Sequence, residues 1–132
     1  MIEHAGLARA RLFLDALGQA DEQAMRDCFT DDVAFHVAGS HPLSGDFRGV
    51  DELLVYFGQL RALTDGTHAL AAESVLANDH HTAFVTRTTG RRGTDVSLDV
   101  LETHVFTVRS DGLWREYWVS ADDQDAEDDF WS

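Results

Sequence analysis

The sequence has few of the residues that crosslink, break or anchor a chain. Its only cysteine is Cys28, so no disulfide can form within the 132 residues, and we expect a protein of the reducing cytoplasm. Its only proline is Pro42. No apolar run reaches about 18 residues, the length of a membrane-spanning helix, and the start lacks the pattern of a secretory signal. We therefore expect no association with a membrane.

Basic residues are also scarce. Ten Lys and Arg stand against 24 Asp and Glu, a formal net charge of −14. A surface this acidic repels phosphate backbones, which argues against nucleic acid as a partner and favours small neutral or cationic ligands. The length predicts one domain, residues 1–132. Residues 122–132 form an acidic tail that either stays solvated or folds back as a flap through Phe130 and Trp131.

Hydrophobic periodicity predicts helices first and strands second. Helical spacing covers residues 2–17, a short stretch that follows Asp21 and ends before Thr30, and residues 50–63, with one strand at 33–38. Four further strands are predicted at 69–77, 82–90, 95–109 and 113–120. This order predicts an α+β fold with helices over one face of the sheet. The other face of the sheet is expected to carry the apolar side chains of Leu101, Val105, Trp114 and Trp118. We therefore predict a homodimer formed through this face.

The strand at 95–109 carries the most unusual side chain. His104 shares its face with Val100 and Phe106, and only Glu102 beside it is also polar. Two explanations are open. His104 is either a buried imidazole satisfied by Glu102 or by a backbone carbonyl, or part of a pocket wall, where it acts as acid, base or hydrogen-bond donor to a carbonyl.

Two segments resemble a known family. FTDDVAFHVAGSHPLSGDFRGVDELLVYF and ETHVFTVRSDGLWREYWVSADDQDAEDDFW are similar to the SnoaL-like branch of the nuclear transport factor 2-like superfamily, which includes polyketide cyclases and Δ5-3-ketosteroid isomerases. The resemblance implies a curved, mixed, mainly antiparallel sheet that forms a cone around a pocket, a cystatin-like α+β barrel. It also implies three helices over one face and a dimer across the sheet.

The isomerase residues do not carry over to this sequence. The helical Tyr of those enzymes falls on Phe13, and their oxyanion-binding acid falls on His104. Their general base falls on Val37 or His36, depending on where the alignment is anchored. A proton transfer next to a ketone needs a carboxylate base and an oxyanion donor, so these replacements argue against a ketosteroid isomerase.

The cyclase residues are also replaced. The general acid and base of the cyclases falls on Val119, and the nearest acids, Asp122 and Asp123, are expected at the rim of the cone. We expect a protein without cofactor or metal that binds a hydrophobic, carbonyl-bearing polyketide- or steroid-like compound. It is either an isomerase or cyclase or a non-catalytic binding or assembly module. An epoxide hydrolase is a further alternative, with Arg87 and Asp99 as strand candidates for its cluster.

The candidate catalytic residues are His104, His36 and Tyr117, and the candidate ligand-binding residues are Phe13, Phe35, Phe57, Glu102 and Val119. His36 alternates with Phe35 and Val37, so it faces the opposite side of the sheet, and belongs to the dimer interface, if those two line the core. Tyr117 and Trp114 are expected on opposite faces of their strand.

Overall fold

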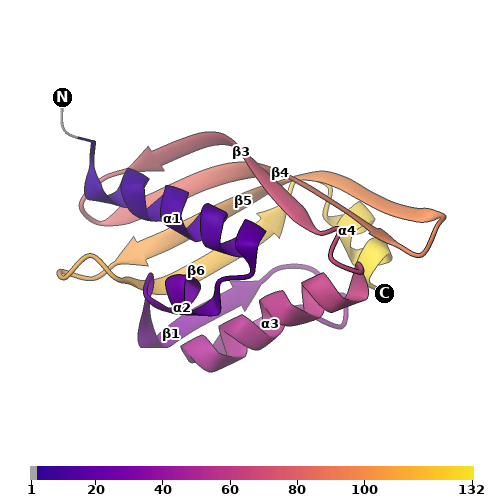
Figure 1. Ribbon diagram of the computed structural model, residues 1–132, viewed down its shortest axis with the longest axis horizontal. Helices are drawn as coiled ribbons and strands as arrows, with labels where there is room; N and C mark the ends of the chain where they lie inside the picture. Colours follow the sequence, from indigo (N-terminus) through magenta and orange to yellow (C-terminus); the bar gives the residue numbers. More distant parts are fainter. Residues whose placement is uncertain (1–2) are drawn as a thin grey trace.

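The computed structural model describes residues 3–132 (Figure 1). Within that range the chain forms four helices and six strands: α1 (Ala5–Gln19), α2 (Glu22–Arg26), β1 (Phe29–Val37), β2 (Gly45–Arg48), α3 (Val50–Leu63), β3 (Ala69–Ala77), β4 (His81–Arg92), β5 (Val96–Val108), β6 (Trp114–Ala121) and α4 (Gln124–Trp131). The expected α+β class is confirmed, and the third predicted helix and the strand at 69–77 have the predicted bounds.

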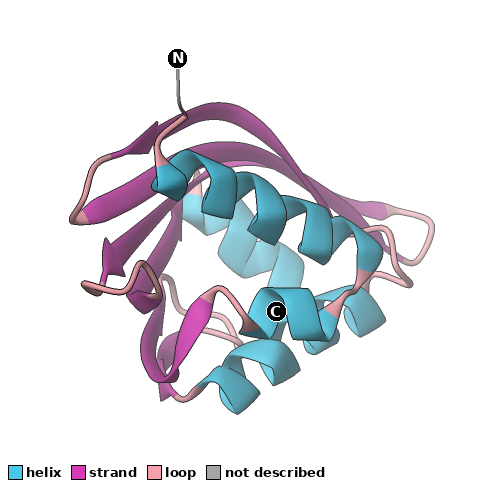
Figure 2. Ribbon diagram, turned by 60° about the vertical axis from the view of Figure 1, so that its left-hand side comes forward, coloured by secondary structure: helices cyan, strands magenta, loops and turns pink. Residues whose placement is uncertain are grey.

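All six strands belong to one sheet in the order β2-β1-β6-β5-β4-β3. β1 and β6 run parallel, and every other neighbouring pair runs antiparallel. Figure 2 shows this sheet curling around the helices without closing on itself. The mixed, mainly antiparallel cone expected from the resemblance is thus confirmed, as an open sheet.

Three features in the first half of the chain differ from the prediction. The short helix α2 ends at Arg26, and β1 begins at Phe29, four residues before the predicted strand. The predicted helix start at Ile2 lies outside the described residues, and α1 continues to Gln19, two residues past the predicted end. The strand β2 was not predicted at all. It is four residues long, its burial pattern shows only Phe47 half-buried, and it pairs with the edge of β1. So short an edge strand shows no alternation that a sequence pattern could detect.

The acidic tail folds back onto the sheet as α4. Asp123 begins the helix, because its side chain accepts a hydrogen bond from the backbone N–H of Ala126 at 3.1 Å. Phe130 and Trp131 are each 4% exposed, and Arg92 donates to the Phe130 carbonyl at 2.6 Å. Two buried aromatic side chains and a capped C-terminus fix this segment, so the flap alternative describes it and the solvated alternative is wrong.

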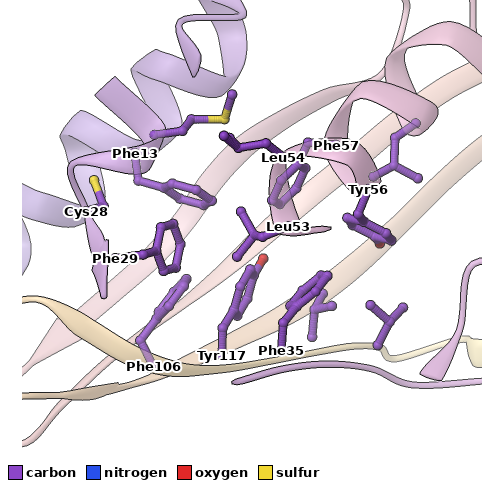
Figure 3. Close-up of a cluster of buried hydrophobic side chains, with 14 of the residues drawn as sticks. Phe13, Cys28, Phe29, Phe35, Leu53, Leu54, Tyr56, Phe57, Phe106 and Tyr117 are labelled. Atoms are coloured by element: carbon purple, nitrogen blue, oxygen red, sulfur yellow. The ribbon is translucent and has the colours of Figure 1, made fainter. Parts of the chain in front are cut away.

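The core is an aromatic cluster between the sheet and the helices, and Figure 3 shows most of it. Phe13 of α1 is fully buried. Its ring lies 5.8 Å from the Phe57 ring and between 5.5 and 6.3 Å from five rings of the sheet, measured between centroids. The rings that it meets in this way are Phe29, Phe84, Phe106, Trp114 and Tyr117. Replacing a phenylalanine in such a position by alanine costs about 3–5 kcal/mol.

Trp114 corrects the predicted parity of the last strand. Thr107 pairs with Glu116, but the next residue of β5, Val108, pairs with Trp114, so Arg115 is an extra residue in a β-bulge. The bulge turns Trp114 into the core, on the same side of the sheet as Tyr117, where it is 0% exposed and stacks on Phe106. The prediction that the two residues lie on opposite faces is wrong.

Candidate functional site

Two polar side chains stand inside the aromatic core, His104 on β5 and Tyr117 on β6. The Tyr117 hydroxyl lies 2.6 Å from His104 Nδ1, and His104 Nε2 lies 3.0 Å from Thr86 Oγ1. His104 is 1% exposed, and burial lowers its pKa to about 3, with His68 adding to the shift. Glu102 Oε1 is 3.6 Å from His104 Nε2, which is too long for a hydrogen bond. The ring is therefore neutral, buried and satisfied by Tyr117 and Thr86.

These hydrogen bonds continue along β4 to the carboxyl group of Glu102, and each group along the way donates to the next. Thr86 Oγ1 lies 2.9 Å from Thr88 Oγ1, and Thr88 donates to Glu102 Oε1 at 2.7 Å. Because each hydroxyl has one hydrogen, Thr86 donates to Thr88 and accepts from His104 Nε2–H. Tyr117 must then donate to His104 Nδ1. A relay of four hydrogen bonds runs from Tyr117 to Glu102.

A second carboxyl group meets the end of this relay. Glu127 of α4 and Glu102 of β5 are both buried. Burial raises the pKa of Glu127 to about 9, and the negative charge of Glu102 adds to the shift. Burial also raises the pKa of Glu102, while hydrogen bonds from Glu127 and Thr88 act in the opposite direction. Two buried carboxyl groups in contact cannot both ionise cheaply, so near neutral pH the pair holds one proton, on Glu127.

The buried His41 closes the other side of Glu127. Its Nδ1 accepts from the backbone N–H of Leu43 at 3.1 Å, which leaves the ring proton on Nε2, 4.0 Å from Glu127 Oε1. Burial lowers the pKa of His41, so the ring is neutral. Ser40 and Gln124 bond to Asp128 beside this contact, and together they attach α4 to the loop after β1. The acid pair is thus covered by α4 and this loop.

An open cavity of about 290 Å³ lies between the C-terminal half of α1, α2, α3 and the segment that leads into β3. Its apolar walls include Leu14, Leu17, Met25, Leu54 and Phe57. His68 is its main polar wall residue besides the charged Glu22 and Arg61. Burial lowers the pKa of His68 to about 4, with the Arg61 charge as second cause, so the imidazole is neutral at pH 7.

The backbone around His68 is fixed by threonine side chains. The Thr64 hydroxyl donates to the Leu60 carbonyl at 2.7 Å and accepts from the His68 N–H at 3.1 Å. Gly90 of β4 lies against the same segment, and a Cβ atom there would be 3.5 Å from His68 Cα. On its other side the His68 ring lies 6.1 Å from the Trp131 ring of α4. The cavity wall is therefore rigid, and α4 supports it.

His36, predicted as a catalytic residue, does not join His104 and Tyr117. Phe35 and Val37 line the core, so His36 points to the outer face of the sheet. Its Nδ1 lies 2.7 Å from Asp46 and its Nε2 lies 2.8 Å from Glu116. Burial lowers the pKa of His36, but the hydrogen bonds and charges of these two carboxylates outweigh it and raise the pKa overall. This follows the sequence alternative in which His36 belongs to the opposite face.

The residues predicted to contact a ligand divide into two groups. Phe57 lines the open cavity, and its neighbour Tyr56 is equally buried on the same helix. Phe13, Phe35 and Val119 fill the core and are at most 5% exposed. Glu102 ends the relay. The rings of Phe84, Phe106 and Tyr117 occupy the space beside His104, with Phe84 at 4.8 Å and Tyr117 at 5.8 Å from its ring centre.

The remaining strand candidates lie outside the cone. Arg87 donates to Asp99 at 2.7 Å and to Glu73 at 3.2 Å on the exposed face of the sheet. The epoxide hydrolase alternative requires its catalytic cluster inside the cone, so Arg87 and Asp99 do not supply one. Asp122 and Asp123 are exposed at the rim, as expected, and Asp123 caps α4.

Sequence reasoning missed His68, Glu127 and His41 as a set. His68 follows a turn, and no local pattern separates it from the other histidines. Glu127 stands in an acidic run, and its only signal is the helical spacing that it shares with Phe130 and Trp131. His41 lies in the loop after β1, and a single loop histidine is a weak signal in sequence.

Comparison with known proteins agrees with this architecture. A family model described as a SnoaL-like domain matches residues 10–117, and the chain belongs to this family. Uncharacterized proteins of Mycobacterium bovis and Mycobacterium tuberculosis are 33% identical to it over 135 residues, covering the full length of both chains. The resemblance to the SnoaL-like branch of the superfamily is confirmed.

Two solved structures are also similar. Bal32a, from a soil-derived mobile gene cassette, superposes with a TM-score of 0.92 at 25% identity and covers 97% of each chain. A protein of unknown function with a cystatin-like fold from Xanthomonas campestris has a TM-score of 0.87 at 24% identity, covering 96% of this chain and 98% of its own. These similarities establish the cystatin-like cone. In the described residues 3–132, no helix is long and apolar enough to cross a membrane.

Proposed function

We propose that this SnoaL-like protein binds a compact, hydrophobic, carbonyl-bearing molecule in the cavity beside His68. One observation carries the proposal. Within residues 3–132, the His68 ring has no hydrogen-bond partner, although it is neutral and lines a largely apolar cavity. A neutral imidazole offers one N–H donor and one acceptor nitrogen, which matches a ketone or a hydroxyl group.

The size of the cavity limits the ligand. About 290 Å³ is at the lower end of the range of roughly 300–1,000 Å³ typical of small-molecule pockets. A bicyclic ketone fits this volume, and a larger polyketide- or steroid-like compound would insert one end. Apolar walls supply affinity through burial, and the imidazole supplies orientation.

We also propose the cytoplasm as the location, since Cys28 is a buried free thiol.

The packing of His104 supports binding over catalysis by that residue. Both of its ring nitrogens are occupied by protein groups, and aromatic rings fill the space around it. A ligand in the open cavity meets His68 and not His104. In this proposal His104 and Tyr117 hold β4, β5 and β6 together behind the cavity.

Native mass spectrometry of the purified protein tests the binding proposal. We expect the wild type to retain a small neutral organic molecule, and Leu17→Trp, which fills the cavity, to lose it. Leu12→Trp is the matched control, because Leu12 lies on the same helix and is 61% exposed. A Leu17→Trp variant that retains the ligand as the wild type does, or a wild type that carries no molecule and binds no aromatic ketone, contradicts the proposal.

Acid–base catalysis is a second candidate function, and the relay is the observation that favours it. The chain of hydrogen bonds from Tyr117 to the Glu102–Glu127 pair has the form of a proton path. Exchange of the α-hydrogens of 1-tetralone in D₂O, followed by ¹H NMR, tests it. Protein-dependent exchange that Tyr117→Phe removes supports an isomerase or cyclase, and exchange no faster than in buffer contradicts it.

A further inference from the structure

A second groove lies at the end of the molecule where α1 begins, away from the cavity beside His68. It encloses about 680 Å³ between the first turns of α1, the β3–β4 turn and the β5–β6 turn. In Figure 1 these three segments lie at the same, left-hand end of the molecule. No residue that lines this groove also lines the cavity beside His68.

The charge of this groove is opposite to that of the protein. Its lining contains Arg9, Arg109 and Arg115 and one carboxylate, Asp79, whereas the whole chain has 10 basic and 24 acidic residues. Asp79 is hydrogen-bonded to His4 at 2.8 Å. Three of the ten basic side chains of a strongly acidic protein therefore gather in one place.

Two of these arginines lack a carboxylate partner. Arg109 forms an ion pair with Asp111, but no acidic oxygen of residues 3–132 lies within 4.0 Å of the guanidinium of Arg9 or Arg115. Arg9 donates to the Asp27 carbonyl at 3.3 Å and also lies close enough to Cys28 to act against the burial that raises the pKa of that thiol. An arginine fork binds a planar oxyanion through two parallel hydrogen bonds, so both side chains are free to do so.

A buried donor without an acceptor belongs to one of the residues behind the groove. Trp114 lines it and is 0% exposed, yet its indole N–H forms no hydrogen bond within residues 3–132. A buried indole N–H normally finds a partner, since leaving one unpaired costs about 1–3 kcal/mol. The first turn of α1 faces the same groove and contains no acidic residue, so the positive end of the helix dipole is not neutralised there.

We infer that this groove is a binding site for a small oxyanion, a carboxylate or phosphate group, held by Arg9 and Arg115 above the buried indole of Trp114. The donors that line it outnumber its acceptors, and its one carboxylate is engaged by His4. The overall charge of −14 does not prevent binding, because at 0.15 M salt charges more than about 8 Å away are largely screened. The inference is independent of the cavity beside His68.

NMR titration of the Trp114 indole N–H tests this site. Inorganic phosphate and acetate are added separately at constant ionic strength, which distinguishes the two oxyanions. We expect one of them to move the Trp114 resonance saturably, and we expect Arg115→Gln and Arg9→Gln each to weaken binding at least fivefold. Arg26→Gln is the control, because Arg26 pairs with Asp51 outside the groove.

Two results would overturn the inference. One is an indole resonance that neither anion moves. The other is an Arg26→Gln variant that weakens binding as much as Arg115→Gln, since the effect would then come from overall charge. Arg115 has no hydrogen-bond partner within residues 3–132, so its replacement tests the site without removing an internal contact.

Discussion

The hydroxyl of Tyr117 donates a hydrogen bond to Nδ1 of His104 at 2.6 Å inside a closed aromatic core. Both side chains are at most 1% exposed. The pair shows how this chain places polar groups in a cone otherwise filled with phenylalanine. Both ring nitrogens of His104 have a partner, and the chain of hydrogen bonds ends at the carboxyl pair under α4.

The first prediction concerns this hydrogen bond. Tyr117→Phe leaves His104 Nδ1 buried without a donor, so we expect it to lower the free energy of unfolding by about 1–3 kcal/mol. Tyr56→Phe is the matched control, because Tyr56 is also buried but its hydroxyl forms no hydrogen bond within residues 3–132. Urea unfolding measures both. Equal losses in the two variants would show that the bond contributes nothing specific.

The tautomer of His104 follows from the direction of the relay. We expect ¹⁵N NMR to show a neutral ring that carries its proton on Nε2 and accepts at Nδ1. Because burial lowers the pKa of this ring to about 3, the ring should stay neutral down to about pH 4. A proton on Nδ1, or a titration near pH 6.5, would contradict the relay.

The lowered pKa of His104 also has a consequence for stability. The unfolded ring takes up a proton below its ordinary pKa of 6.5, and the folded ring takes it up only near 3. This contribution to stability is complete above pH 6.5 and is lost as the pH falls from 6.5 towards 3. Acid unfolding of His104→Gln should accordingly depend less steeply on pH over that range than unfolding of the wild type.

Glu127 predicts a loss of stability at alkaline pH. Its folded pKa of about 9 lies above its ordinary value of 4.5, so the folded state holds a proton that the unfolded state releases. This contribution is complete below pH 4.5 and disappears as the pH rises through about 9. The free energy of unfolding of the wild type should fall as the pH rises from 6.5 to 9. In Glu127→Gln we expect this fall to be smaller by about 1–3 kcal/mol.

The control for Glu127 is Asp129→Asn, which removes an exposed carboxylate from the same helix. Unfolding free energies across the pH series should follow the wild type in this variant. If Glu127→Gln and the wild type show the same pH dependence, the carboxyl pair does not share a proton in the way described.

We propose that two copies associate through the outer face of the sheet. Trp118 is 39% exposed there and stacks on His36 at 5.4 Å. The half-buried Val105 pairs with it across the strands, and the half-buried Leu101 lies further along β5. Trp118→Glu should convert a dimer into a monomer in light scattering at micromolar concentration, and Leu12→Glu, on the helix side, should not. A wild type that is strictly monomeric at that concentration would rule out this interface.

The sequence pattern predicted the regular parts of this structure and missed what long-range contacts create. Strict alternation placed His104 on the inner face of β5, because a strand of 13 residues with period two leaves only one choice. The same argument failed for Trp114, since the bulge at Arg115 reverses parity without any change in residue type. The interior role of α4 was left open because an acidic run is as compatible with solvent as with a capped helix.

The candidate site was harder to predict than the fold. His104 stands out in sequence because its strand neighbours are apolar, yet the structure satisfies it internally. His68 does not stand out, because its surroundings come from α1, α3 and α4, which are distant in sequence. Whether a histidine can contact a ligand depends on which helices and strands pack around it. The sequence pattern near that histidine says little about this packing.

The most direct test of the central proposal compares two ligands that differ only by a carbonyl group. 1-Tetralone and tetralin share a bicyclic skeleton, and calorimetry should show that the wild type binds the ketone roughly tenfold more tightly, about the effect of one hydrogen bond. His68→Phe should bind both compounds equally, while His81→Phe, in the exposed β4 start, should keep the preference. Equal affinity of the wild type for the two compounds, or a preference that survives in His68→Phe, would contradict a carbonyl-binding role for His68.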